Sequence, residues 1–260
     1  MRGGQTIIIV HGGPAAAGGV APLARRLASS WHVLEPFQRG SSSDRPLTVA
    51  VHIRDLAEVV QTRCDRTPPL LVGHSWGAML SLAYAAAYPG TVSGLVLVGC
   101  GTFTQQTRAE YQARLAARVS SGDRESFAQL ARVEPDANRR LAAQGRAMER
   151  ACGYDIDDTD DELVSVDAVA HEQTWADMLR LQRDGIYPAT FSAITCPVLM
   201  LHGAADPHPG DLTRDDLKLY IPQLDYRELA KCGHSPWLER QCREEFYTVL
   251  SEWISSHRPA

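Results

Sequence analysis

A short apolar run that leads into a serine between two glycines constrains this chain more than any other feature. Leu70–Val72 has the length and composition of a buried strand, and the residues Gly-His-Ser-Trp-Gly follow it at positions 73–77. An alanine-rich helical pattern begins at Ala78. Glycine two positions on either side of Ser75 lets strand and helix approach closely while the serine is held in a strained backbone conformation. The pattern predicts a strand, a sharp turn and a helix, with Ser75 exposed at the turn.

Strands and helices alternate along the first hundred residues and again near the C-terminus. Thr6–Val10 and Val92–Cys100 are rich in β-branched and apolar residues, as expected of strands buried on both faces of a parallel sheet. Val49–Arg63 between them has apolar residues at helical spacing, and further strands are expected at Val198–Leu201 and Leu224–Leu229. This alternation favours an α/β fold with a mostly parallel, doubly wound sheet. The other predicted core elements are the helix Val20–Ser29, the strand His32–Glu35 and the C-terminal helix Arg240–Ile254.

Residues 103–191 follow a different pattern. They contain no convincing strand, and helical spacing recurs at Arg108–Ser120, Arg139–Arg150 and Glu172–Arg183. We therefore expect a helical cap over residues 103–191, inserted into an α/β core formed by residues 1–102 and 192–260. Apolar residues of the cap are expected to cover Ser75 and to line or support a pocket, among them Tyr111, Leu115, Trp175 and Leu179.

Two charged clusters need interpretation. The acidic run Asp155–Glu162 fits either a solvated loop or a patch that attracts a cationic substrate group. Arg39 and Asp44 lie in a loop rich in turn-forming residues, where we expect them to pair and brace the loop.

Composition excludes several functional classes. The net charge is −5 and the basic residues are scattered, which argues against a nucleic-acid partner. No apolar run reaches the roughly 18–20 residues of a membrane helix, and the N-terminus shows no cleavage-type leader, so we expect a soluble, cytoplasmic protein without a membrane partner. The six cysteines form neither a CxxC pair nor a zinc-type cluster, so we expect reduced thiols and no metal.

Three polar residues fall in an order that suggests chemistry. A serine hydroxyl is a poor nucleophile until a base accepts its proton, and that base needs an acceptor to hold its tautomer. Asp206 and His234 each follow a predicted strand, and the chain order Ser75, Asp206, His234 is the order that accompanies a serine on a strand-to-helix turn. Upstream, two glycines in His11–Pro14 end a strand and leave backbone amides free to face a ligand.

Through these motifs the sequence resembles the α/β-hydrolase family over essentially the whole chain. The resemblance rests on His11–Pro14, residues 73–77, His202–Asp206 and the Gly-His pair at 233–234.

The resemblance implies a role for each matching residue. Ser75 is the nucleophile, His234 is the general base and then the acid, and Asp206 orients His234. The backbone amides of Gly13 and Trp76 form the oxyanion hole.

Within the family, the chain looks most like the proline iminopeptidase group. It combines HGGP, QRG followed by serines and an arginine, and a tryptophan in the strand-to-helix turn of Ser75 (residues 73–77), which is called the nucleophile elbow. It departs from that group where Ala15–Ala17 follow Pro14, where His74 replaces a glycine, and where only Met1–Gln5 precede the first strand. The cap carboxylates that hold a substrate amine in that group cannot be matched residue by residue to the acidic run of this chain, so no substrate-binding residue is assigned.

The expected activity is that of a serine hydrolase cleaving a small ester or amide through an acyl-enzyme, without a cofactor. Two alternatives stay open. The same triad serves lactonases and hydrolases of carbon–carbon bonds, and the fold also serves binding proteins without turnover. The sequence indicates no oligomeric state.

Overall fold

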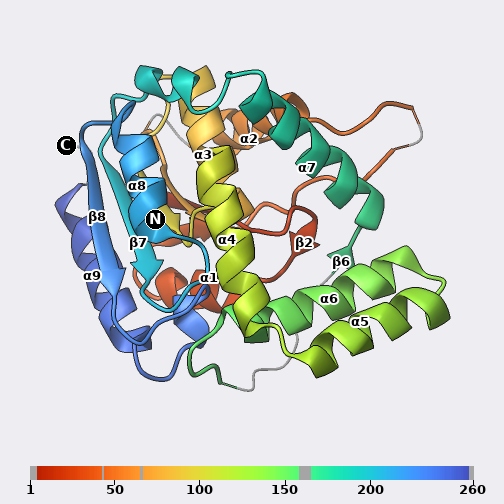
Figure 1. Cartoon of the computed structure of the whole chain (residues 1–260). Helices are drawn as coiled ribbons and strands as arrows, with labels where there is room; N and C mark the ends of the chain where they lie inside the picture. Colours follow the sequence, from red (N-terminus) through yellow and green to blue (C-terminus); the bar gives the residue numbers. More distant parts are fainter. Residues whose placement is uncertain (1–4, 43, 65–66, 158–164, 258–260) are drawn as a thin grey trace.

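A six-stranded parallel sheet forms the centre of the molecule (Figure 1). The computed structural model describes residues 5–257 except 43, 65–66 and 158–164. Neighbouring strands follow the order β3-β1-β4-β5-β7-β8, and every pair is parallel. The strands are β1 (Thr6–Val10), β3 (His32–Leu34), β4 (Leu70–His74), β5 (Gly94–Val98), β7 (Val198–Gly203) and β8 (Leu224–Leu229).

Helices cover both faces of the sheet, which explains the continuous apolar runs of its central strands. Successive residues of β4 point to opposite faces: Leu71 packs in one buried cluster, and Leu70 and Val72 pack in the other. The cluster of Leu71 includes residues of α2 (Val49–Arg63), α3 (Trp76–Ala87) and α8 (Gly210–Lys218), and the other includes residues of α1 (Ala21–Ala28) and α9 (Arg243–Ser256).

The strand order reverses between β1 and β4. From β1 the chain steps outward to β3, and it then returns to β4 and continues to the opposite edge. In open α/β sheets, ligands bind beyond the carboxyl ends of the strands at such a switch point. The segments after β1 and β4 are those that carry Gly13 and Ser75.

The described part of the chain between β5 and β7 contains four α-helices, which lie to the right of β7 and β8 in the view of Figure 1 (yellow-green to teal). They are α4 (Gln105–Arg118), α5 (Ser121–Val133), α6 (Ala137–Cys152) and α7 (Ala168–Arg183). We propose that they form the cap. The expectation that residues 103–191 hold no strand was wrong: β6 (Ser165–Val166) pairs antiparallel with β2 (Ala16–Ala17), which begins two residues after the His-Gly-Gly-Pro motif. Short 3-10 helices lie at Ala189–Ala193 and Pro236–Leu238.

Two pairings differ from the sequence-based expectations. Cys232 and Cys242 form a disulfide, with their Cα atoms 5.7 Å apart, instead of remaining reduced. Arg39 forms a two-pronged ion pair with Asp55 on α2, at 2.5 Å for each contact, instead of bracing its loop through Asp44. No helix within the described ranges is long and apolar enough to cross a membrane.

Candidate active site

Ser75 lies at a strained turn between β4 and α3. Its backbone has φ 54° and ψ −116°, a conformation that few residues other than glycine adopt. The flanking glycines permit this turn: a Cβ at Gly77 would collide with the carbonyl of Val10 on β1, and a Cβ at Gly73 would collide with the carbonyl of Gly77. The elbow expected from the sequence is therefore present in the backbone.

His74, which replaces the glycine usual in the proline iminopeptidase group, is part of the support for the histidine loop. Its Nε2 donates to the carbonyl oxygen of His234 at 3.1 Å, and its ring packs edge-on against Trp237 with centroids 4.6 Å apart. Burial, followed by the charge of His234, holds the pKa of His74 well below its usual value, so the ring is neutral and serves as a hydrogen-bond donor.

Asp206 and His234 are in direct contact. Asp206 follows β7, and its Oδ2 accepts a hydrogen bond from Nδ1 of His234 at 2.7 Å. Burial disfavours the charge of Asp206, but His234 and two further histidines outweigh it and hold its pKa well below the usual range. Burial lowers the pKa of His234, but the charge of Asp206 and their hydrogen bond outweigh burial and raise it. The contact fixes the proton on Nδ1 and leaves Nε2 available as a base.

Ser75 and His234 line the same cavity, which has a volume of about 510 Å³. Gly13 and Trp76 also line it. Among the described residues no hydrogen bond joins the Ser75 hydroxyl to His234, which is common in unliganded sites whose contacts tighten around substrate.

The backbones of Gly13 and Trp76 have distinctive positions beside this cavity. Gly13 has φ 114°, and a Cβ there would lie 2.6 Å from the Cβ of Ala16. Trp76 is the first residue of α3, so its amide has no acceptor within the helix. The indole Nε1 of Trp76 donates to Oε1 of Gln38 at 2.8 Å, and Nε2 of Gln38 donates to the carbonyl of His11 at 2.8 Å, which ties both loops together.

The segments between β5 and β7 contribute most of the remaining cavity wall. Tyr111 and Trp175 line it, as expected. Leu115 and Leu179, named with them, do not line it. The cavity residues from α6 and α7 that sequence analysis did not single out are Leu141, Ala142, Gln144, Gly145, Met148, Glu149, Cys152 and His171.

Sequence analysis also missed His208. Its backbone amide and its Nδ1 donate to Oδ1 of Asp206, at 2.9 and 2.8 Å. An Asp-Pro pair often begins a turn in which the carboxylate accepts the amide two residues later, so the motif contained a signal for this contact. Asp206, His208 and His234 are the single group of three potential metal ligands in the described part of the chain, and they already hydrogen-bond to one another.

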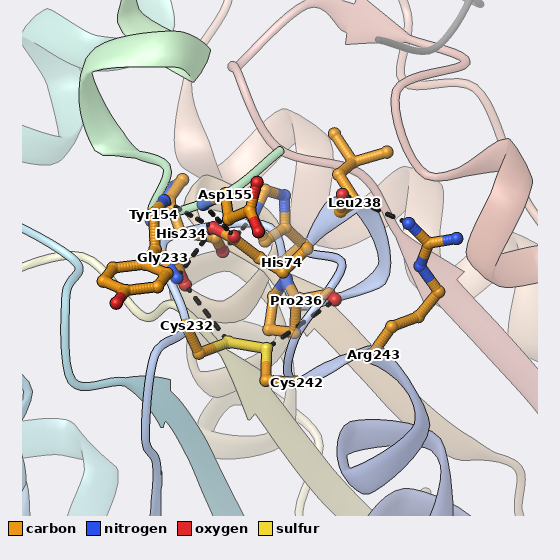
Figure 2. The surroundings of a disulfide bond; sticks show 11 residues. His74, Tyr154, Asp155, Cys232, Gly233, His234, Pro236, Leu238, Cys242 and Arg243 are labelled. Atoms are coloured by element: carbon orange, nitrogen blue, oxygen red, sulfur yellow. Dashed lines mark hydrogen bonds between the residues drawn. A yellow bond between two sulfur atoms is a disulfide. The ribbon is translucent and has the colours of Figure 1, made fainter. Parts of the chain in front are cut away.

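A disulfide and several hydrogen bonds hold the loop that carries His234 in place (Figure 2). The disulfide joins this loop to Cys242, just before α9, and the amide of His234 donates to the carbonyl of Cys152 at 3.0 Å. Glu239 is fully buried and accepts hydrogen bonds from the amides of Gly233, Tyr154 and Asp155. These contacts attach the histidine loop to the chain that follows α6.

The acidic run does not reach the cavity in the part that the structure describes. Asp155 pairs with Arg240 at 2.9 Å, and Asp157 pairs with both Arg240 and Arg243. These two residues brace the chain after α6 through ion pairs with Arg240 and Arg243. Residues 158–164 lie outside the described residues.

Comparisons with known proteins agree with this architecture. The chain is 28% identical to a 2-(acetamidomethylene)succinate hydrolase from Mesorhizobium japonicum over 77% of its length and 70% of that protein. It is 36% identical to a proline iminopeptidase from Neisseria meningitidis over 37% of its length and 33% of that protein. It is 29% identical to a cis-3-alkyl-4-alkyloxetan-2-one decarboxylase from Shewanella oneidensis, over 38% of the chain. The chain thus spans about a third of the length of the last two relatives.

Solved structures share the fold across the whole chain. A putative lipase from Acinetobacter baumannii superimposes with a TM-score of 0.65 at 21% identity, covering 98% of this chain and 86% of that one. A proline iminopeptidase from Mycobacterium smegmatis gives a TM-score of 0.61 at 20% identity, covering 97% and 90%. The model of the alpha/beta hydrolase family matches residues 7–247, which include the elbow of Ser75 and the Asp206–His234 pair. The chain therefore belongs to the alpha/beta hydrolase family.

Proposed function

We propose that this protein is a serine hydrolase that cleaves a small ester or amide through an acyl-enzyme at Ser75. The observation that carries the proposal is the hydrogen bond of 2.7 Å between Asp206 and His234, beside a strained Ser75 in a shared cavity. A buried carboxylate that fixes the tautomer of a histidine next to a serine in a cavity is the arrangement that activates a serine hydroxyl.

The proposed reaction uses each of these groups in turn. Ser75 Oγ attacks the substrate carbonyl as Nε2 of His234 takes its proton, and Asp206 stabilises the imidazolium that forms. The amides of Gly13 and Trp76 receive the developing oxyanion. His234 then protonates the leaving group, and a water molecule activated by the same histidine releases the acid from Ser75.

Covalent labelling tests this proposal. A fluorophosphonate should label the protein, and Ser75→Ala should abolish labelling and lower ester hydrolysis on the order of 10³-fold or more without unfolding the protein. Ser235→Ala is the matched control, because Ser235 lines the same cavity and should leave the labelling intact. Labelling that survives in Ser75→Ala would reject Ser75 as the nucleophile.

A specific observation favours substrates with a free amine, as in the proline iminopeptidases. Glu149 lines the cavity from α6, and its Oε1 is buried without a hydrogen-bond partner among the described residues. A buried carboxylate oxygen without a donor is costly, and a substrate ammonium would satisfy it through a charge-assisted hydrogen bond. Glu149 thus takes the role that sequence analysis considered for the acidic run.

Glu149→Gln separates this substrate class from neutral esters. The variant should raise KM for proline naphthylamide on the order of 10-fold and change KM for a neutral p-nitrophenyl ester much less. Because Glu149 also raises the pKa of His234, both substrates should be compared above the acid limb of each variant's pH profile. Glu110→Gln on the exposed side of α4 is the control. Equal effects on both substrates would favour a neutral ester, a lactone or a carbon–carbon bond as the target.

A further inference from the structure

The carboxylate of Asp206 accepts hydrogen bonds from two neighbouring histidines, and the proposed triad requires only one of them, His234. Its Oδ2 accepts from Nδ1 of His234 at 2.7 Å, and its Oδ1 accepts from Nδ1 of His208 at 2.8 Å. The two imidazole rings are stacked, with centroids 4.5 Å apart and planes at 19°. Tyr111 stacks on the other face of His208, at 4.0 Å and 17°. The ring of His208 is thus fixed on both faces and at one edge.

The hydrogen bonds determine what His208 offers to a ligand. Nδ1 carries the proton, because its partner is the carboxylate oxygen of Asp206. Burial lowers the pKa of His208, so the ring is neutral and its Nε2 is an acceptor. This Nε2 has no hydrogen-bond partner within the described ranges, the side chain of His208 is 12% exposed, and the ring lines the cavity. Two parallel histidines therefore present Nε2 edges to the same space.

We propose that His208 binds the leaving group of the substrate by accepting a hydrogen bond from a hydroxyl or N–H on the carbon adjacent to the one that bears the leaving oxygen or nitrogen. The proposal rests on the proposed function. His234 must contact the leaving atom in order to protonate it, and the ring of His208 lies 4.5 Å from that of His234. Two heteroatoms on neighbouring carbons can each reach one of the two Nε2 atoms at this separation: the leaving atom receives the proton of His234, and the neighbouring hydroxyl or N–H donates to His208. The substrate class is a monoester of a vicinal diol, or an ester or amide of an amino alcohol.

A pair of esters that share one acid isolates this contact. The 2-hydroxyethyl and 2-methoxyethyl esters of the same acid form the same acyl-enzyme, so the ratio of their kcat/KM values reports only on the leaving group. The wild-type protein should prefer the hydroxyethyl ester on the order of 10-fold, the usual effect of one hydrogen bond to a buried acceptor. Release of the acid is followed at constant pH.

Two variants of His208 remove the acceptor in different ways. His208→Asn retains a short amide that can donate to Asp206, and His208→Phe retains the stack between Tyr111 and His234. In both, the ratio of the two kcat/KM values should fall close to one. The ratio cancels any change in the pKa of His234, because both substrates use the same base. Thermal unfolding shows whether either variant is folded, and one folded variant is sufficient.

Three results would overturn the proposal. One is a wild-type protein that shows no preference between the two esters. Another is a set of variants that retain the preference while both rates fall together, which is what a role confined to supporting Asp206 produces. A preference found instead between 2-hydroxyacyl and 2-methoxyacyl esters would place the donor on the acyl side. Failure of the proposed function is distinguishable, because it appears as fluorophosphonate labelling or hydrolysis that does not depend on Ser75.

Discussion

Glu239 is the buried carboxylate on which the histidine loop depends, and its replacement by glutamine should cost several kcal/mol. Its side chain is fully buried in the short connection between β8 and α9. Oε1 accepts from the amides of Gly233 and Tyr154, each at 2.8 Å, and Oε2 accepts from the amide of Asp155 at 2.7 Å. Gly233 immediately precedes His234, and the other two donors lie just after α6.

The magnitude follows from these three contacts. A hydrogen bond to a charged group contributes about 1.5–3 kcal/mol, and one between neutral groups contributes about 1 kcal/mol. In Glu239→Gln the amide oxygen can keep the two bonds of Oε1 as weaker neutral bonds, but the NH₂ group faces the amide of Asp155 and leaves it unsatisfied. The total loss is about 3–5 kcal/mol, which in a protein of this size lowers Tm by roughly 10 °C.

Thermal and urea unfolding of Glu239→Gln test this estimate. The control is Glu244→Gln on α9, whose carboxylate is 76% exposed and pairs with Arg26 at 3.2 Å. An exposed pair of this kind contributes about 0–1 kcal/mol, so the control should unfold close to the wild-type Tm. If both variants unfold together with the wild type, the three amides do not depend on the carboxylate and the reasoning is wrong.

Three further predictions concern the site and its surroundings. The charge of Asp206 raises the pKa of His234 against the effect of burial, so Asp206→Asn should move the acid limb of the pH profile of kcat/KM to lower pH. The same variant should reduce the maximal rate on the order of 10⁴-fold. An acid limb at the wild-type pH would contradict the effect of Asp206 on the pKa of His234. Nδ1 of His171 donates to the carbonyl of Pro14 at 3.0 Å, so His171→Leu should lower kcat more than it changes KM, and His171→Asn should retain part of the lost kcat. Equal losses of kcat in the two variants would show that the hydrogen-bond donor does not matter. A reductant should destabilise the protein by about 3 kcal/mol by opening the disulfide, and a Tm insensitive to reductant would contradict this.

The core was largely predictable because its strands are buried on both faces and its helices have one apolar stripe. The predicted bounds of Val49–Arg63 and Leu224–Leu229 coincide with α2 and β8. Thr48 caps α2 by accepting from the amide of Val51, which fixes where that helix begins. The pairing of β2 with β6 was not predictable, because each contributes two residues and the register Ala16–Val166 joins segments far apart in sequence.

The residues of the site likewise fall into some that the sequence could predict and some that it could not. Ser75, Asp206 and His234 each follow a strand of one parallel sheet, so their approach follows from chain order once the fold is assigned. Glu149 lies on a helix, where rotation of less than one turn decides between cavity and solvent, and that rotation is set by packing that periodicity does not reveal.

The contacts between the proposed cap and the core explain why the part of the chain that was least predictable from sequence has direct effects on the site. β6 and His171 hold the loop of Gly13, and Cys152 and the buried Glu239 hold the loop of His234. A substitution that disturbs one of these contacts is therefore expected to affect a proposed catalytic group as well as the cavity wall. Because these contacts are made by backbone atoms on at least one side, they specify few residue types, and neither motif nor composition reveals them. The same segments line the cavity and support the loop of the proposed oxyanion site. Substitutions in them that change substrate preference should therefore change kcat together with KM.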